Sequence, residues 1–335
     1  MDLPTLLSLV FFILSSLSGV SSGSSRNITS MFTLGDSHID TGNALIMAAP
    51  GMPVWIDKPP YGETFFDHPS GRFSDGRVII DFIADEFGLP FLPAFLANGP
   101  NISQGVNLAV GGATAIELGW FEQIRPSVCS GASEGCLGNA LFFVGELGVN
   151  DYNFIWMAGK TEDEVKTYVP KVVETISMAV ERLINEGAVY VIVPGNPPTG
   201  CSPAVLTFRL SPNKTDYDHI GCLRNVNAVA RYHNLLLRAA MGSLRGRYPT
   251  PGSSSPTSTN PSSESSRTPA NSACCGAGGA YNWDPSAFCG MPGVAAYVSW
   301  DGVHYTEATN RYIAEGWLHG PYADPPILTA VQQYY

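Results

Sequence analysis

The sequence predicts an α/β fold, in which a parallel β-sheet is covered by helices on both faces. Short and almost wholly apolar segments that end in glycine alternate with longer segments in which apolar residues recur at helical spacing. Strands that are apolar along their whole length are typical of parallel sheets that are buried on both faces. The chain has 335 residues, of which 44% are hydrophobic and 14% charged, so it is long enough to bury such a core.

The amino terminus does not follow this pattern and is predicted to be a signal peptide over residues 1–23. Residues 3–14 are apolar, and small residues follow them as far as Gly23. Such a run is typical of a secretory leader and is too short to be a membrane anchor, although Asp2 stands where a basic residue is usual. We expect cleavage near residues 20–25, secretion, and no integral membrane span.

Three N-glycosylation sequons agree with export. They begin at Asn27, Asn101 and Asn213. Each is a weak signal alone, because such tripeptides are frequent by chance. Together with the leader, they indicate a secreted glycoprotein.

Seven cysteines follow the leader, and in an oxidising compartment they are expected to form disulfides. The candidate local pairs are Cys129 with Cys136 and Cys201 with Cys222, because the members of each pair are neighbours in the sequence. The number is odd, so at least one thiol lacks a partner within the chain.

Composition and spacing argue against two kinds of ligand. The formal net charge is −11, and no basic stripe is present that would neutralise phosphates, so we expect no nucleic-acid partner. The six histidines are scattered, and the chain contains neither a Cys-X-X-Cys pair nor a His-Glu-X-X-His motif. We therefore expect no metal site.

Four strands and four main helices are predicted, within a single domain over residues 30–325. The predicted strands are 31–34, 105–110, 140–144 and 188–193. The predicted helices are 78–87, 163–185 and 306–318, and residues 218–248 are expected to be mostly helical. The helix over 163–185 is expected to have its cap near Thr161 and to stop at Gly187.

Residues 250–272 interrupt this alternation. The segment is rich in serine and proline and contains no large apolar residue, which is a composition typical of a flexible linker. The rhythm of strands and helices would place a fifth strand here. The fifth strand of the sheet is therefore doubtful.

Residues suited to catalysis stand where three predicted strands end. Ser37 follows the first strand. It is either a nucleophile at a helix N-terminus or an ordinary helix cap. Gly112 follows the second strand and either offers a backbone N–H donor or only forms part of a tight turn. Asn150 follows the third strand, and its amide either donates to an oxyanion or forms an ordinary Asx turn. Since the carboxyl ends of parallel strands meet at one edge of a sheet, we expect these residues to lie together.

Asp301 and His304 precede the last helix at a spacing of three residues. At this spacing Asp301 can orient His304 as a general base, whereas the ordinary alternative is a helix cap beside an unrelated histidine. With Ser37 they complete the set that a serine nucleophile requires. The order Ser, Asp, His is that of α/β-hydrolases, but the Gly-X-Ser-X-Gly elbow is absent.

Four blocks of sequence carry a resemblance to a known family. Residues 33–43 contain Gly-Asp-Ser-His, and residues 105–114 contain Gly-Val-Asn-Leu-Ala-Val-Gly-Gly. Residues 144–152 contain Gly-Glu-Leu-Gly-Val-Asn-Asp, and residues 300–308 begin Trp-Asp-Gly-Val-His. These resemble the first, second, third and fifth blocks of the plant GDSL esterase/lipase family, a branch of the SGNH hydrolases. The likeness covers about residues 31–323 and is closest to the sinapine esterase-like and acetylajmalan esterase-like branch.

The resemblance implies the three-layer α/β/α SGNH hydrolase fold, with a five-stranded parallel sheet in the order 2-1-3-4-5. It implies a carboxylic ester hydrolase without a metal or organic cofactor. Ser37 would be the nucleophile, His304 the base and Asp301 its orienting partner. The oxyanion hole would comprise the backbone N–H groups of Ser37 and Gly112 and the side chain of Asn150.

The resemblance also bears on partner and location. It implies a small-molecule acyl ester as substrate, and we expect a monomer. Secretion would deliver the protein to the apoplast or cell wall, with the vacuole as the alternative destination.

Two departures from the family pattern affect these expectations. His38 stands where leucine is usual in the first block, and we expect little effect from it. Residues 250–272 replace the apolar strand that the family carries, so one alternative function is a catalytically impaired glycoprotein on the same fold. A second alternative is an acyltransferase, in which an alcohol instead of water intercepts the same acyl-enzyme.

Overall fold

The computed structural model describes six parts of the chain: residues 28–48, 55–115, 137–249, 272–274, 281–284 and 294–332. The predicted signal peptide, the sequon at Asn27 and the candidate pair of Cys129 and Cys136 lie outside these residues. Residues 250–271 also lie outside them, and with them the position expected for a fifth strand.

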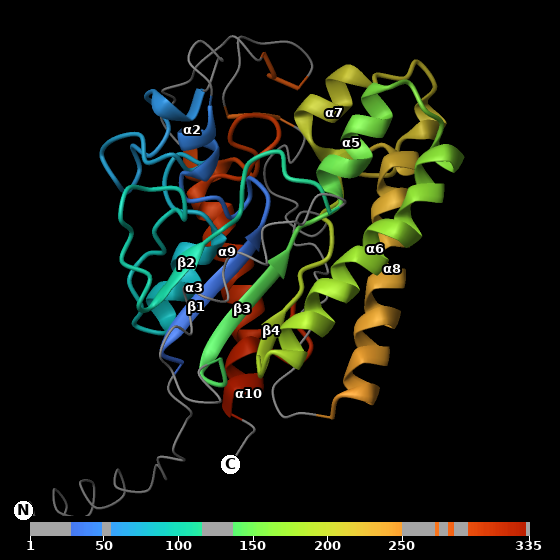
Figure 1. Ribbon diagram of the computed structural model, residues 1–335. Coiled ribbons are helices and arrows are strands. Elements are labelled where there is room, and N and C mark those ends of the chain that lie inside the picture. Colours follow the sequence, from blue (N-terminus) through green and yellow to red (C-terminus); the bar gives the residue numbers. More distant parts are fainter. Residues whose placement is uncertain are drawn as a thin grey trace, which may run out of the picture.

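The described sheet has four parallel strands: β1 (Ser30–Gly35), β2 (Gly105–Asn107), β3 (Ala140–Gly145) and β4 (Tyr190–Ile192). Their order is β2-β1-β3-β4, so β1 and β3 lie at its centre (Figure 1). Phe32 of β1 pairs with Val106 on one side and with Phe142 on the other. Every strand residue is buried, which explains the continuous apolar segments. The parallel α/β sheet is confirmed.

Helices cover both faces of this sheet and give three layers (Figure 1). Helices α6 and α8 pack together on one face, and α3, α9 and α10 on the other. Alternate residues of β3 enter the two cores: Phe142 faces α6 and α8, whereas Phe143 faces α3 and α9. The helices are α2 (Asn43–Met47), α3 (Ile79–Glu86), α5 (Val149–Met157), α6 (Glu162–Asn185), α7 (Pro203–Phe208), α8 (Arg224–Arg247), α9 (Glu307–His319) and α10 (Ile327–Gln332).

Helix α6 begins and ends where its sequence signals predict. Thr161 caps it: the side chain of Thr161 accepts a hydrogen bond from the backbone N–H of Glu164, and the Glu164 carboxylate accepts one from the N–H of Thr161. The chain leaves the helix through Gly187, whose φ is 98°. Helix α6 buries its apolar face against the sheet and leaves its polar face exposed to solvent. Across the described ranges, no helix combines the length and the hydropathy that crossing a bilayer requires.

Helix α8 begins at Arg224, later than the predicted position 218. The carboxylate of Asp218 accepts hydrogen bonds from the backbone N–H groups of Ile220 and Cys222, at 3.1 and 2.9 Å, and so closes a turn of its own. A side chain bonded to its own backbone in this way competes with helix formation. Most of residues 218–248 is therefore helical, and the exact start was not visible because apolar spacing continues through the turn.

The packed domain extends beyond the predicted boundary at residue 325. Helix α10 contacts α9, and its residues Ile327 and Val331 are buried in the same core. The described fold therefore continues to Gln332, at the end of α10.

Candidate active site

The predicted catalytic residues lie at the edge of the sheet where the strands end. Ser37 follows β1, Gly112 follows β2, and Asn150 stands in the first turn of α5, directly after β3. In Figure 1 the strand arrowheads point to one end of the molecule, toward α5 and α7. Asp301 and His304 lie on the loop that leads into α9. Parallel topology thus joins the three strand-end residues, and the α9 loop adds the other two.

Ser37, His304 and Asp301 form a hydrogen-bonded chain. The Nε2 atom of His304 lies 2.8 Å from Oγ of Ser37, and its Nδ1 atom lies 2.7 Å from Oδ2 of Asp301. A carboxylate only accepts hydrogen bonds, so Nδ1 carries the proton and donates it. Nε2 is then left to accept the hydroxyl proton of Ser37. This is the arrangement of a nucleophile, a base and an orienting acid.

Asp301 is held in its charged form. Burial by itself would raise the pKa of Asp301, but the neighbouring His304 and the hydrogen bonds outweigh it and keep this pKa well below the usual range. The backbone N–H groups of Val303 and His304 donate to its Oδ1 atom at 3.0 and 2.8 Å. An ionised Asp301 stabilises an imidazolium at His304.

Tyr61 donates a further hydrogen bond to this carboxylate. Its hydroxyl group lies 2.9 Å from Oδ2 of Asp301, although the two residues are 240 positions apart in the chain. The Tyr61 side chain is buried, and its ring meets that of Trp300 edge-on, with 5.5 Å between the ring centres. Ring packing therefore fixes the hydroxyl beside the oxygen that orients His304. No local pattern in the sequence points to Tyr61.

The three predicted oxyanion donors surround the nucleophile turn. Among the described residues, no acceptor is bonded to the backbone N–H of Ser37 or Gly112. Gly112 has a φ of 83°, and a Cβ atom there would meet nothing within 4 Å, so this backbone borders open space. The amide nitrogen of Asn150 donates to the carbonyl of Ala113 at 3.0 Å and to Oδ2 of Asp36 at 3.3 Å. These bonds hold Asn150 beside the turn that contains Gly112.

A buried carboxylate, Asp40, joins the first block to the second. Burial raises the pKa of Asp40, and four hydrogen bonds oppose that rise. The donors are the backbone N–H groups of Gly42, Asn43, Ala44 and Gly111. Since Ser37 and Gly112 flank this junction, Asp40 fixes the spacing between two predicted oxyanion donors. From the sequence alone, Asp40 could be recognised only as a polar residue before a helix, and this contact with Gly111 could not be predicted.

The position of His304 is fixed by a distant segment of the chain. The backbone N–H of Glu307, in the first turn of α9, donates to Oδ1 of Asp75 at 2.7 Å. The Glu307 carboxylate in turn accepts from the guanidinium group of Arg77 at 2.8 Å. The ring of Phe73 lies 4.6 Å from that of His304. Residues 73–77 therefore hold His304 in place against Ser37.

His38 lies in a buried ionic cluster beside these groups. Its Nδ1 atom is 3.1 Å from Oδ1 of Asp36 and 3.2 Å from Oε2 of Glu146, and all three side chains are buried. Their potential ligand atoms lie within 4.8 Å of one another, as in some metal sites. However, the imidazole nitrogen is at ion-pair distance from both carboxylates. We interpret the group as an ion-pair cluster and assign no metal ligands.

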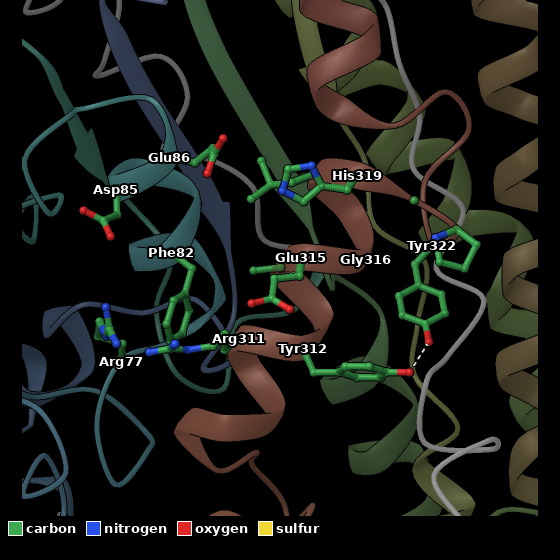
Figure 2. A pocket seen from close by; sticks show the side chains of 14 residues that line it. Arg77, Phe82, Asp85, Glu86, Arg311, Tyr312, Glu315, Gly316, His319 and Tyr322 are labelled. Carbon is green, nitrogen blue, oxygen red and sulfur yellow. Dashed lines mark hydrogen bonds between the residues drawn. The ribbon is translucent and has the colours of Figure 1, made fainter. Parts of the chain in front are cut away.

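Two cavities differ in their relation to these residues. A cavity of about 70 Å³ adjoins the catalytic loop, where His38, Val303 and Tyr305 contribute to its lining. A groove of about 680 Å³ lies between α3 and α9, and Figure 2 shows Tyr312 and Tyr322 joined by a hydrogen bond on its wall. None of the hydrogen-bonded catalytic residues lines this groove, so its size does not mark the reaction site.

The remaining predicted site residues are not part of the hydrogen-bonded catalytic chain. Asn101 and Asn213 are exposed, as glycosylation acceptors must be. Cys201 and Cys222 form a disulfide that closes the loop before α8.

Comparison with known proteins agrees with this geometry. The family model described as GDSL-like lipase/acylhydrolase matches residues 31–317. The chain is 43% identical to the GDSL esterase/lipase At2g27360 of Arabidopsis thaliana, over 90% of this chain and 87% of the relative. It is 40% identical to the GDSL esterase/lipase At1g28580 of the same plant, over 97% of this chain and 94% of the relative.

Proposed function

Because the chain belongs to the GDSL-like lipase/acylhydrolase family and is a carboxylic ester hydrolase, we propose that Ser37, His304 and Asp301 carry the reaction. The observation that carries this proposal is the continuous hydrogen-bonded chain from Ser37 Oγ through the imidazole to Asp301. In this arrangement Nδ1 of His304 donates to the Asp301 carboxylate, which leaves Nε2 to accept the Ser37 proton.

The first half of the reaction forms an acyl-enzyme. Oγ of Ser37 attacks the ester carbonyl carbon while Nε2 of His304 takes the hydroxyl proton. The tetrahedral intermediate then collapses, the carbon–oxygen bond to the alcohol breaks, and Nε2 returns the proton to the leaving alcohol oxygen. The charge of Asp301 stabilises the imidazolium that exists between these steps.

The second half releases the acid. Water gives a proton to Nε2 of His304 and attacks the acyl carbon, and the bond to Ser37 Oγ breaks as Oγ regains that proton. In both halves the oxyanion would bind the backbone N–H groups of Ser37 and Gly112 and the amide of Asn150. Attack by an alcohol in place of water would produce a new ester, which is the acyltransferase alternative.

Hydrolysis of 4-nitrophenyl acetate by the purified protein, with methanol as a competing acceptor, tests this proposal. At steady state we expect 4-nitrophenol to equal the sum of acetate and methyl acetate, preceded by a burst of 4-nitrophenol where deacylation is slow. Acetate in excess over methyl acetate supports the hydrolase. Methyl acetate as the main product supports the acyltransferase instead.

The pH dependence follows from the protonation states that the triad requires. A general base accepts the Ser37 proton only in its unprotonated form, and Asp301 stays ionised as the pH falls because its pKa is held low. Activity is therefore expected to fall reversibly toward pH 5 while the fold persists. Initial rates from pH 5 to 9, with circular dichroism at each pH, check this. A flat rate profile would contradict the role of His304.

Replacing Tyr61 with phenylalanine is expected to lower kcat by about tenfold, because the hydrogen bond to Asp301 is lost. A carboxylate with one donor fewer attracts the His304 proton more strongly, so the acid limb of the rate profile should move to higher pH. The pH dependence of kcat/KM measures both effects.

Tyr312→Phe is the matched control, because it removes a tyrosine hydroxyl that contacts Tyr322 in the groove between α3 and α9. We expect no change in rate or profile for this variant. An unchanged acid limb in Tyr61→Phe would show that Tyr61 only fills space.

We also propose secretion, supported by the predicted leader, the exposed acceptors Asn101 and Asn213, and the disulfide of Cys201 with Cys222. Expression in plant cells with intact-mass analysis tests this. We expect the protein in the extracellular fraction, with a new amino terminus near residues 20–25 and a mass that falls on glycosidase treatment. An uncleaved, unglycosylated intracellular protein would contradict it. A small-molecule acyl ester as substrate and a monomeric state remain part of this proposal.

A further inference from the structure

Two carboxylates that the mechanism does not use are buried beside the reacting groups. Asp36 directly precedes Ser37, and Glu146 follows β3 at a left-handed φ of 55°. Their relative exposures are 1% and 3%. Within the described parts of the chain, no lysine or arginine forms an ion pair with either carboxylate, whereas Nδ1 of His38 lies within 3.2 Å of both.

The burial of Asp36 and Glu146 requires a positive charge on His38. An unpaired buried carboxylate is strongly unfavourable, so a cation that serves two of them is favoured. Burial by itself would lower the pKa of His38, but the charges of Glu146 and Asp36 outweigh it and raise this pKa to about 9. Burial also raises the pKa of Glu146, against the opposing charge of His38. Geometry and charge thus agree on an imidazolium at neutral pH.

This cluster is connected to the proposed oxyanion hole. Oδ1 of Asp36 faces His38, and Oδ2 of the same carboxylate accepts a hydrogen bond from the Asn150 amide. Negative charge that develops at the oxyanion would be repelled by uncompensated carboxylates beside it, because both carboxylates are buried and therefore weakly screened by water.

We propose that His38 is a positioning residue, whose imidazolium anchors Asp36 and Glu146 and offsets their charge while Asp36 holds the Asn150 amide. The proposal rests on the proposed function, since the oxyanion forms only when Ser37 attacks an ester. It also replaces the expectation that His38 matters little. Since the oxyanion exists only after attack, loss of His38 should lower kcat more than it changes KM.

The groups that face His38 come from three segments. They are Asp36 on the nucleophile turn, Glu146 after β3, and Asp301, His304 and Tyr305 on the catalytic loop. A folded-state pKa raised in this way favours the protonated form at neutral pH, and that form is lost as the pH rises through about 9. Activity is therefore expected to fall on the alkaline side as His38 becomes neutral.

The charge of His38 is measured directly by NMR of the wild-type protein labelled with 15N in its histidine rings. We expect the His38 ring to be cationic at pH 7.5 and to titrate near pH 9. His233 is a built-in reference for a neutral buried ring, because burial lowers its pKa to about 3. A neutral His38 at pH 7.5, or one equivalent of a bound divalent metal by elemental analysis, overturns the proposal.

His38→Gln tests the consequence for catalysis and identifies the His38 resonance. We expect kcat to fall by about 10- to 100-fold with KM little changed, and the alkaline limb of the rate profile to disappear. The matched control is His319→Gln at the end of α9, for which we expect no change. Wild-type kcat with an unaltered alkaline limb in His38→Gln overturns the proposal.

The two readouts separate this inference from the proposed function. If Ser37→Ala still hydrolyses the ester, the proposed function fails, and so does the catalytic role of His38. The wild-type NMR titration still decides the charge of the cluster in that case. It also decides the charge if His38→Gln does not fold.

Discussion

Replacing Ser37 with alanine is expected to lower kcat for ester hydrolysis by about 10⁴- to 10⁶-fold. The Oγ atom is both the nucleophile and the hydrogen-bond partner of His304, at 2.8 Å, and alanine removes both functions. The oxyanion donors and Asp301 remain, so a small residual rate over water is expected. Because the Ser37 side chain is small and buried in a turn, the fold should persist.

The matched control for this substitution is Ser177→Ala. Ser177 lies within α6, where its hydroxyl donates only to the Val173 carbonyl of the same helix, so activity should be unchanged. Steady-state kinetics and circular dichroism of both variants check the result. Ester hydrolysis that survives Ser37→Ala at the wild-type rate would remove Ser37 from the mechanism.

Replacing Asp301 with asparagine is expected to lower kcat by about 10³- to 10⁴-fold, by analogy with the effect known for triads of this type. In the wild-type protein, Oδ2 of Asp301 accepts hydrogen bonds from Nδ1 of His304 and from the hydroxyl group of Tyr61. An amide in its place carries no charge, and it can present N–H groups that favour the wrong tautomer of His304. Nε2 then carries the proton and cannot accept the one from Ser37.

Asp163→Asn is the control for the loss of an aspartate charge. Asp163 is exposed in the first turn of α6 and is not part of the hydrogen-bonded chain of Ser37, His304 and Asp301. We expect wild-type kinetics for Asp163→Asn and a rate for Asp301→Asn that stays low at every pH from 5 to 9. A rate for Asp301→Asn that recovers fully at high pH would mean that Asp301 only adjusts the basicity of His304.

The parts of the fold that could be predicted from the sequence are those set by local pattern. The apolar runs became β1 to β4, because a strand buried on both faces must be apolar at every position. Ser37 and Asn150 could be placed because each directly follows a strand, and parallel topology then brings the strand ends together. The contact between Asp301 and His304 could also be predicted, because residues three positions apart can meet within one turn of the chain.

The parts that could not be predicted depend on contacts between distant segments. Tyr61 reaches Asp301 across most of the chain, and Asp40 binds the N–H of Gly111 on another strand end. The contact between His38 and Glu146 shows the same limit, because nothing near His38 in the sequence indicates that the two side chains are buried together. The exact start of α8 could not be predicted, because a side-chain turn at Asp218 determines it.

Fluorophosphonate labelling of the folded protein, followed by peptide mapping, tests the central claim most directly. The reagent phosphonylates a serine only when a base activates it and an oxyanion site receives it, so it reports the assembled geometry. We predict one phosphonyl group per chain, attached to Ser37, and no labelling of the Ser37→Ala variant. A folded protein that remains unlabelled, or one labelled at another serine, would contradict the account.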